Sequence, residues 1–228
     1  MQLDGQVVAI TGAFGALGSA VVQAALAEGA QVAAIDRAPS PRASLGAAAL
    51  FGDVDLASNE GAQAAIDAIV ARYGRLDALV NIAGGFRWEQ LAGGSLDTWD
   101  TLYALNLRTA VAACRAALPH LPEGRGRIVN IGAAGAVKAG AGMGAYAATK
   151  SGVARLTEAL AEELKPRGIT VNAVLPSIID TPANRADMPK ADFGTWVAPA
   201  QLADVIVFLL SAKAQAVTGA LLPVTGRV

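Results

Sequence analysis

The chain has 228 residues, of which 54% are hydrophobic, 5% aromatic and 16% charged, a composition and length that suit one ordered domain and argue against disorder. Its 18 basic and 19 acidic residues nearly cancel, so charge gives no reason to expect nucleic acid or a membrane surface as partner. The single His120 and the single Cys114 exclude a zinc, haem or iron–sulfur site, a disulfide and a CxxC redox pair, and they disfavour a Ser-His-Asp hydrolase.

Short apolar segments alternate with helical patterns along the whole chain. In chain order we expect a strand at 6–10, a helix at 20–28, a strand at 31–35, a weak strand before Gly52, a helix at 62–72, a strand at 78–82, a helix at 95–118, a strand at 127–131, a helix at 144–164, a strand at 170–175, a helix at 201–210 and a strand at 221–224. Ser95 is a plausible N-cap of the third helix.

This alternation predicts an α/β fold with a single domain over residues 1–228. Strands that are apolar nearly throughout indicate a sheet covered on both faces. We therefore expect a Rossmann fold, a doubly wound parallel sheet of about seven strands with helices on both faces. The polar, proline-bearing segment 177–197 is too long for an ordinary loop and is predicted to be a substrate-binding loop or lid.

A glycine-rich turn follows the first strand, with the sequence Thr11-Gly12-Ala13-Phe14-Gly15-Ala16-Leu17-Gly18. Such a turn can bring backbone N–H groups and a helix N-terminus to a pyrophosphate, although glycine can also simply mark a tight turn. Asp36 ends the second strand, where a carboxylate can accept both ribose hydroxyls of an adenosine. The same carboxylate repels a 2′-phosphate and favours NAD(H), whereas the neighbouring Arg37 could pair with that phosphate and leaves NADP(H) possible.

Tyr146 and Lys150 stand four positions apart and share one face of the expected helix at 144–164. An ammonium near a phenol favours the phenolate and lowers the tyrosine pKa, so that the phenol can exchange a proton with a substrate near neutral pH. A surface pair is the alternative interpretation, because this spacing is common.

Together these residues resemble the short-chain dehydrogenase/reductase family over nearly the whole chain. The matching features are the TGxxxxxG turn, Asp53-Val54, Asn81-Ile82-Ala83-Gly84, Asn106, Tyr146, Lys150, and Pro176 leading to Thr181. The resemblance implies Tyr146 as the acid/base, Lys150 as the group that holds the nicotinamide ribose and lowers the tyrosine pKa, and Asn106 as the holder of a proton-relay water. The hydride chemistry would belong to the cofactor.

The resemblance also implies a set of cofactor contacts. Gly12, Gly15 and Gly18 would line the pyrophosphate, Asp36 would hold the adenosine ribose, Asp53 and Val54 would flank the adenine, Asn81, Ala83 and Gly84 would run beside the cofactor, and Ile178 and Thr181 would meet the nicotinamide carboxamide. A homodimer or homotetramer built on the two long helices is a further implication, with a small-molecule substrate and with neither nucleic acid nor membrane as partner.

Three positions depart from the family pattern. Ala16 takes the place of the usual middle glycine, and Ile82 that of a second asparagine. The family's catalytic serine normally lies thirteen residues before the tyrosine, and that position is Ala133. No Ser or Thr occurs between Asn130 and Tyr146. Losing one such hydrogen-bond donor typically costs a carbonyl reductase about 10²–10³ in rate.

One branch of the family, the dihydropteridine reductases, tolerates this loss because its substrate accepts hydride readily. The chain resembles that branch in Ala83-Gly84-Gly85-Phe86 and in residues 180–196, DTPANRADMPKADFGTW, whereas Asn106 resembles the ordinary dehydrogenases. Trp88, Ala133 and Trp196 are the candidate substrate-side residues, beside Arg185 for a flat polar substrate. The alternative for Trp196 is that it pins the loop to the core.

The sequence thus predicts an NAD(P)H-dependent oxidoreductase that transfers a hydride between a nicotinamide cofactor, with NAD favoured and NADP possible, and a small carbonyl, alcohol or conjugated heterocyclic substrate. The alternatives are a quinonoid dihydropteridine reductase and an NAD-binding sensor or partner protein that has lost catalysis. No apolar run approaches the ~18 residues of a membrane helix, and no signal peptide is evident. A soluble, cytoplasmic enzyme is therefore expected.

Overall fold

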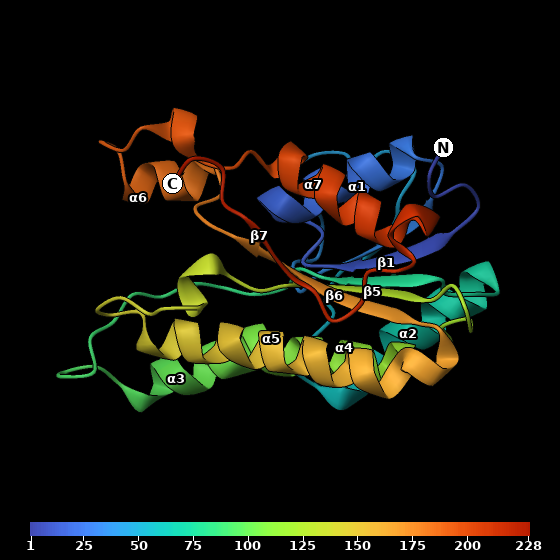
Figure 1. The fold of residues 1–228 in the computed structure, drawn as a ribbon, viewed down its shortest axis with the longest axis horizontal. Coiled ribbons are helices and arrows are strands. Elements are labelled where there is room, and N and C mark those ends of the chain that lie inside the picture. The colour runs from blue at the N-terminus through green and yellow to red at the C-terminus, as the bar shows by residue number, and fades with distance from the viewer.

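The computed structural model describes residues 1–228, which fold around one parallel sheet of seven strands (Figure 1). The strands are β1 (Val7–Thr11), β2 (Gln31–Ile35), β3 (Ala49–Phe51), β4 (Ala78–Asn81), β5 (Arg127–Ile131), β6 (Thr170–Pro176) and β7 (Leu221–Val224). Their order is β3-β2-β1-β4-β5-β6-β7. The connections change direction between β1 and β4, and ligands of open α/β sheets bind at the carboxyl ends of the strands beside such a point. The predicted doubly wound fold is confirmed.

Helices cover both faces of this sheet. They are α1 (Ala16–Ala27), α2 (Asn59–Tyr73), α3 (Leu96–Leu102), α4 (Thr109–Ala117), α5 (Gly144–Leu164), α6 (Pro182–Asp187) and α7 (Pro199–Leu210). In Figure 1, α1 and α7 lie on one side of the sheet, and α2, α4 and α5 lie on the other. None of these helices combines the length and the hydropathy that a membrane crossing requires.

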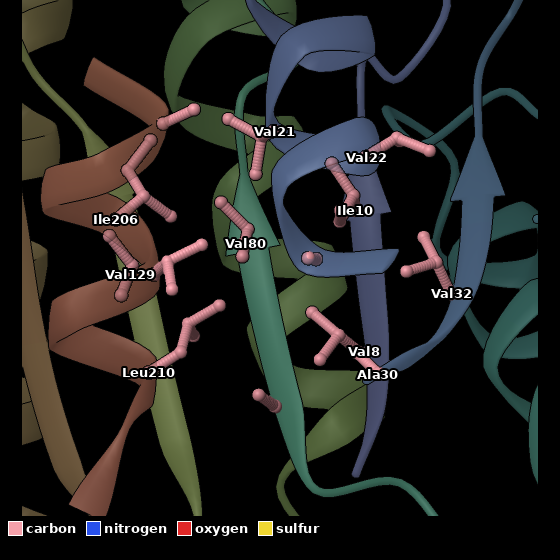
Figure 2. Packing of buried hydrophobic residues seen from close by; sticks show 14 of the residues in the cluster. Val8, Ile10, Val21, Val22, Ala30, Val32, Val80, Val129, Ile206 and Leu210 are labelled. Atoms are coloured by element: carbon pink, nitrogen blue, oxygen red, sulfur yellow. The ribbon is translucent and has the colours of Figure 1, made fainter. Parts of the chain in front are cut away.

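The strands are apolar on both faces because each face is the floor of its own core. Val8 and Ile10 of β1 point toward α1 and α7, where they join Ile206 (Figure 2). Ala9 of the same strand points the other way and belongs to the cluster that contains Ile66 of α2. This two-sided burial explains why the strands read as continuous apolar runs, without the alternation of a half-exposed sheet.

Helix boundaries differ from the sequence prediction at two places that bear on the site. The helix α1 starts at Ala16, with Gly15 as its N-cap, so the glycine-rich turn runs straight into the helix. The helix expected at 95–118 is interrupted by a π-helix, Tyr103–Arg108, between α3 and α4. Ser95 caps α3 as predicted, since its side chain accepts a hydrogen bond from the backbone N–H of Asp97.

Candidate active site

The glycine-rich turn packs directly against the residues that follow β4. Gly12 has φ +64°, and a Cβ there would lie 2.7 Å from the Ala83 nitrogen. A Cβ on Gly18, in the first turn of α1, would lie 2.1 Å from the Gly12 carbonyl oxygen. No side chain caps α1, so its first N–H groups are free to bind an anion, as the predicted pyrophosphate site requires.

Thr11 is a residue of this turn whose role the sequence prediction missed. Its hydroxyl oxygen accepts hydrogen bonds from the backbone N–H groups of Ile82, at 3.0 Å, and Ala83, at 3.2 Å. The ends of β1 and β4 are thereby held together at the change of direction in the sheet. In the sequence, the position of Thr11 directly before the first glycine of the turn could have indicated this role.

The predicted adenosine-binding residues lie together at the end of β2. The Asp36 carboxylate accepts a hydrogen bond from the Phe14 N–H, at 2.9 Å, through one oxygen and from the Ala38 N–H, at 3.0 Å, through the other. The Val54 N–H donates to the Asp36 carbonyl, and Asp53 before it has φ +58°. Each carboxylate oxygen keeps a lone pair for a ligand hydroxyl, so this cluster fits a ribose.

The side chain of Asn81 does not face this crevice. It is buried, and its Nδ2 donates to Asn130 Oδ1 at 2.9 Å and to Cys114 Sγ at 3.2 Å. Asn130 in turn donates to Thr157 Oγ1 at 2.9 Å. These bonds brace β4 and β5 against α4 and α5, so the Asn81 side chain supports the sheet and only the backbone of Asn81 is left for the predicted position beside the cofactor. Burial raises the pKa of the Cys114 thiol to about 12.

Tyr146 and Lys150 line one cavity of about 240 Å³ at the carboxyl ends of the strands. The other lining residues are Leu17, Ile82, Gly84, Gly85, Phe86, Ile131, Gly132, Pro176, Ser177 and Ile179. The cavity therefore connects the start of α1 with α5 and with the ends of β4, β5 and β6. The rings of Phe86 and Tyr146 meet edge to face, with centroids 5.0 Å apart.

Burial dominates the protonation of this pair. The Lys150 Nζ is almost inaccessible to solvent and donates to the Ile131 carbonyl oxygen at 2.8 Å. Desolvation lowers the pKa of Lys150 to about 8 and raises the pKa of Tyr146 to about 12. The tyrosine pKa is thus raised, whereas the sequence predicted that the lysine would lower it, because burial disfavours the charged form of both groups.

Asn106 lies in the π-helix and links three elements of the site. Its Oδ1 accepts a hydrogen bond from the Gly85 N–H at 2.8 Å, and its Nδ2 donates to Thr149 Oγ1 at 3.0 Å. Thr149 donates in turn to the Tyr146 carbonyl oxygen at 2.8 Å. The sequence prediction missed Thr149, although it stands inside the Tyr-Lys turn. Asn106 therefore holds the loop after β4 against the turn of α5 that carries Tyr146.

Ala133 is buried and faces a second cavity, of about 370 Å³, which also touches Lys150. The nearest hydroxyl in that lining belongs to Ser151, and it donates to the Ala136 carbonyl oxygen. In the cavity that Tyr146 lines, the hydroxyl belongs to Ser177, and it donates to the Thr225 carbonyl oxygen at 2.7 Å.

The two residues predicted to meet the nicotinamide, Ile178 and Thr181, lie next to the cavity lining and are not part of it. Ile179, and not Ile178, lines the cavity, while the Ile178 carbonyl accepts a hydrogen bond from the Val197 N–H. Thr181 caps α6, because its Oγ1 accepts a hydrogen bond from the Asn184 N–H at 3.2 Å. Both residues thus shape the backbone of the segment that contributes Ser177 and Ile179 to the cavity.

Residues 180–196 are held together by contacts among their own side chains. Asp180 binds the Arg185 guanidinium through both carboxylate oxygens, and that guanidinium stacks 4.8 Å from the Phe193 ring centroid. Phe193 contacts Trp196, which is only 7% exposed. These contacts fit the alternative in which Trp196 pins the loop. Arg227, near the C-terminus that lies beside α6 in Figure 1, adds a bond from its guanidinium to the Gly194 carbonyl oxygen at 2.7 Å.

Comparison with known proteins gives a consistent result. A model of the short chain dehydrogenase family matches residues 6–192. The chain is 35% identical to a D-threitol dehydrogenase of Mycolicibacterium smegmatis, over 99% of this chain and 93% of that protein. It is 33% identical to a 3-oxoacyl-(acyl-carrier-protein) reductase of Thermotoga maritima, over 99% and 98%. A blue fluorescent protein from a metagenomic library, solved in complex with NADPH, superposes with a TM-score of 0.88 at 32% identity, covering 100% of this chain and 99% of that one.

Proposed function

Because the chain belongs to the short-chain dehydrogenase family of NAD(P)-dependent oxidoreductases, we propose that Tyr146 is the acid/base of hydride transfer between the nicotinamide cofactor and a small carbonyl, alcohol or conjugated heterocyclic substrate. The observation that carries this proposal is the single cavity that Tyr146 and Lys150 share next to the uncapped start of α1. A phenol can pass a proton only to an atom it touches, and this cavity is where such an atom fits.

The residues of the crevice fit a dinucleotide. Gly12, Gly15 and Gly18 would hold its pyrophosphate at the start of α1, Asp36 its adenosine ribose, Asp53 and Val54 its adenine, Ala83, Gly84 and the backbone of Asn81 its middle, and Ile178 and Thr181 its carboxamide. When bound, the cofactor supplies or accepts the hydride. Lys150, whose Nζ makes one hydrogen bond to the protein, has N–H donors left for the second ribose.

Proton transfer rests on three side chains. At neutral pH the half-buried Tyr146 is a neutral phenol and so is ready to donate a proton to a substrate oxygen or nitrogen. Lys150, with its pKa lowered to about 8, can pass a proton on or hold its charge close to the phenol. Asn106 would support the water that returns the proton from solvent, while its side chain keeps the Tyr146 turn in place.

NAD(H) is the favoured cofactor in this proposal. The Asp36 carboxylate stands fixed at the end of β2 and would repel a 2′-phosphate, although Arg37 beside it could attract one. We expect the wild type to bind NADH more tightly than NADPH. Asp36→Asn should reduce the difference between the two affinities. Fluorescence titration of both cofactors measures this, and tighter binding of NADPH by the wild type would reverse the assignment.

A second candidate is reduction of a quinonoid dihydropteridine. Ala133 favours it, because an acceptor that takes hydride readily needs no second hydrogen-bond donor beside Tyr146. Phe86 beside the tyrosine and the lid motif at 180–196 are similar to the branch of the family that acts on such substrates. In this proposal residues 177–197 form the substrate-binding lid, and Trp88 and Trp196 support it.

The function is tested by turnover of NADH or NADPH with ketones, alcohols and a quinonoid dihydropterin. We expect Tyr146→Phe to abolish turnover and to leave NADH binding nearly intact. Tyr103→Phe is the matched control, since Tyr103 is half exposed on the π-helix and should behave as wild type. Wild-type-like turnover in Tyr146→Phe would reject the proposal. Tight NADH binding without turnover of any substrate would favour a binding protein that has lost catalysis.

A homodimer or homotetramer belongs to the same proposal. The continuous helix formed by α3, the π-helix and α4 exposes large apolar side chains to solvent, namely Leu96, Trp99, Tyr103 and Val111. Light scattering of the purified chain should give at least the mass of a dimer, and Val111→Glu should shift it toward the monomer.

A further inference from the structure

We propose that Phe86 limits the size of the substrate that reaches Tyr146, and that Trp88 is the positioning residue that holds Phe86 there. This inference rests on the proposed oxidoreductase function. It assigns Trp88 a role different from direct substrate contact.

The Phe86 side chain stands at the open side of the tyrosine. Its ring meets the Tyr146 ring at 82° and 5.0 Å, and both line the cavity of about 240 Å³. Phe86 is 57% exposed, so the hydrophobic core does not require it. Most of the wall beside Tyr146 is apolar, with Leu17, Ile82 and Phe86 among its residues, so the shape of this wall limits how a substrate can lie.

Trp88 fastens the loop that carries Phe86 to the loop after β5. The indole Nε1 donates to the Ala141 carbonyl oxygen at 2.9 Å, and the backbone N–H of Glu89 donates to the Gly142 carbonyl oxygen at 2.9 Å. The indole lies directly on Gly142, where a Cβ would stand 2.2 Å from the Trp88 Cε2 atom. Only a residue without a side chain leaves room for this contact.

The two loops meet at the N-terminus of α5, the helix that carries Tyr146. Gly142 is followed by Met143, the N-cap of α5, and Tyr146 lies in the first turn of that helix. On the other side of the contact, Trp88 is two positions beyond Phe86. The contacts of Trp88 and Glu89 therefore tie the loop that carries Phe86 to the loop that leads into the turn of Tyr146.

The first experiment compares two vicinal diketones, 2,3-butanedione and 1-phenyl-1,2-propanedione, with wild type and Phe86→Ala. Removing the ring should raise the ratio of kcat/KM for the phenyl compound over the small one by about tenfold. This ratio is unaffected by the fraction of enzyme that is folded. Turnover of both compounds with an unchanged ratio in Phe86→Ala would overturn the inference. Absence of turnover by the wild type, in this pair and in the wider substrate panel, would instead reject the proposed function.

The second experiment tests the role of Trp88 from both sides of its contact. Trp88→Ala and Gly142→Ala should each shift the kcat/KM ratio in the same direction as Phe86→Ala. Trp88→Phe keeps a ring on Gly142 and should give a ratio between those of Trp88→Ala and the wild type. Gly93→Ala is the control, because Gly93 has a similarly positive φ of +79° but open space around a Cβ. A wild-type ratio in Trp88→Ala, or equal behaviour of Gly142→Ala and Gly93→Ala, would show that Trp88 does not position Phe86.

Discussion

The Lys150 ammonium donates a hydrogen bond to the Ile131 carbonyl oxygen over 2.8 Å, in a place that water hardly reaches. Burial lowers the lysine pKa from 10.5 to about 8 in the folded chain. Between these values the unfolded chain binds more protons than the folded one, so the free energy of unfolding rises with pH across this window. Below pH 8 the buried charge opposes folding by up to about 3 kcal/mol.

Urea denaturation at several pH values from 7 to 10 checks this expectation. Lys150→Met, which cannot titrate, should be more stable relative to wild type at pH 7 than at pH 10. Parallel pH profiles for the two proteins would contradict it. Tyr146, whose pKa burial raises to about 12, is present in both proteins, so its own effect on the pH dependence cancels in the comparison.

The two glycines in the turn and helix start should respond differently to alanine. A methyl on Gly18 would meet the Gly12 carbonyl oxygen at 2.1 Å, whereas a methyl on Gly15 would find its nearest atom at 3.4 Å. We expect Gly18→Ala to lower the free energy of unfolding by about 1–3 kcal/mol and to weaken NADH binding at least tenfold. Gly15→Ala should stay close to wild type in urea denaturation, because its methyl meets no atom closer than ordinary contact. Equal losses in both variants would show that the packing of this turn is described wrongly.

Two buried threonines of α5 allow activity to be separated from stability. Thr149→Val leaves the Asn106 amide without its acceptor, and Thr157→Val does the same to Asn130. Each change should cost about 1–3 kcal/mol of unfolding free energy. Only Thr149→Val should also lower kcat, by about tenfold, since Thr149 bonds to the Tyr146 turn. Similar kcat values in the two variants, measured well below their melting temperatures, would argue against a positioning role for Asn106.

Restoring a hydroxyl beside the tyrosine distinguishes the two candidate substrate classes. Ala133→Ser returns the hydroxyl that the family pattern has at this position, and activity on simple ketones should rise by about 10²-fold. Activity on a quinonoid dihydropterin should change little, because that acceptor does not depend on the donor. Steady-state kinetics with both substrates and one cofactor measure the contrast. A parallel rise in both activities would remove the argument that Ala133 suits a readily reduced acceptor.

Much of this fold could be predicted because its boundaries are local. The helix at 144–164 and the strands at 31–35 and 127–131 were placed to the residue, since glycine, proline or charge ends each apolar pattern. The sequence predicted that Tyr146 and Lys150 lie together, because four positions on one helix place two side chains on the same face. It could not predict the directions of their pKa shifts, because the residues that bury them come from elements distant in sequence. The inward direction of Asn81 likewise depends on Asn130, whose partnership only the sheet register creates.

The π-helix Tyr103–Arg108 has one more consequence, for changes of chain length. It lies within a helix that runs without a break from α3 to α4, and a π-turn is equivalent to one extra residue in an α-helix. Deleting one residue there would leave a regular α-helix with the faces of α3 and α4 in their present phase. Asn106 would lose its place against Gly85 and Thr149. A one-residue deletion is therefore expected to keep the helices α3 and α4 and to remove the contacts that hold the Tyr146 turn of α5 in place.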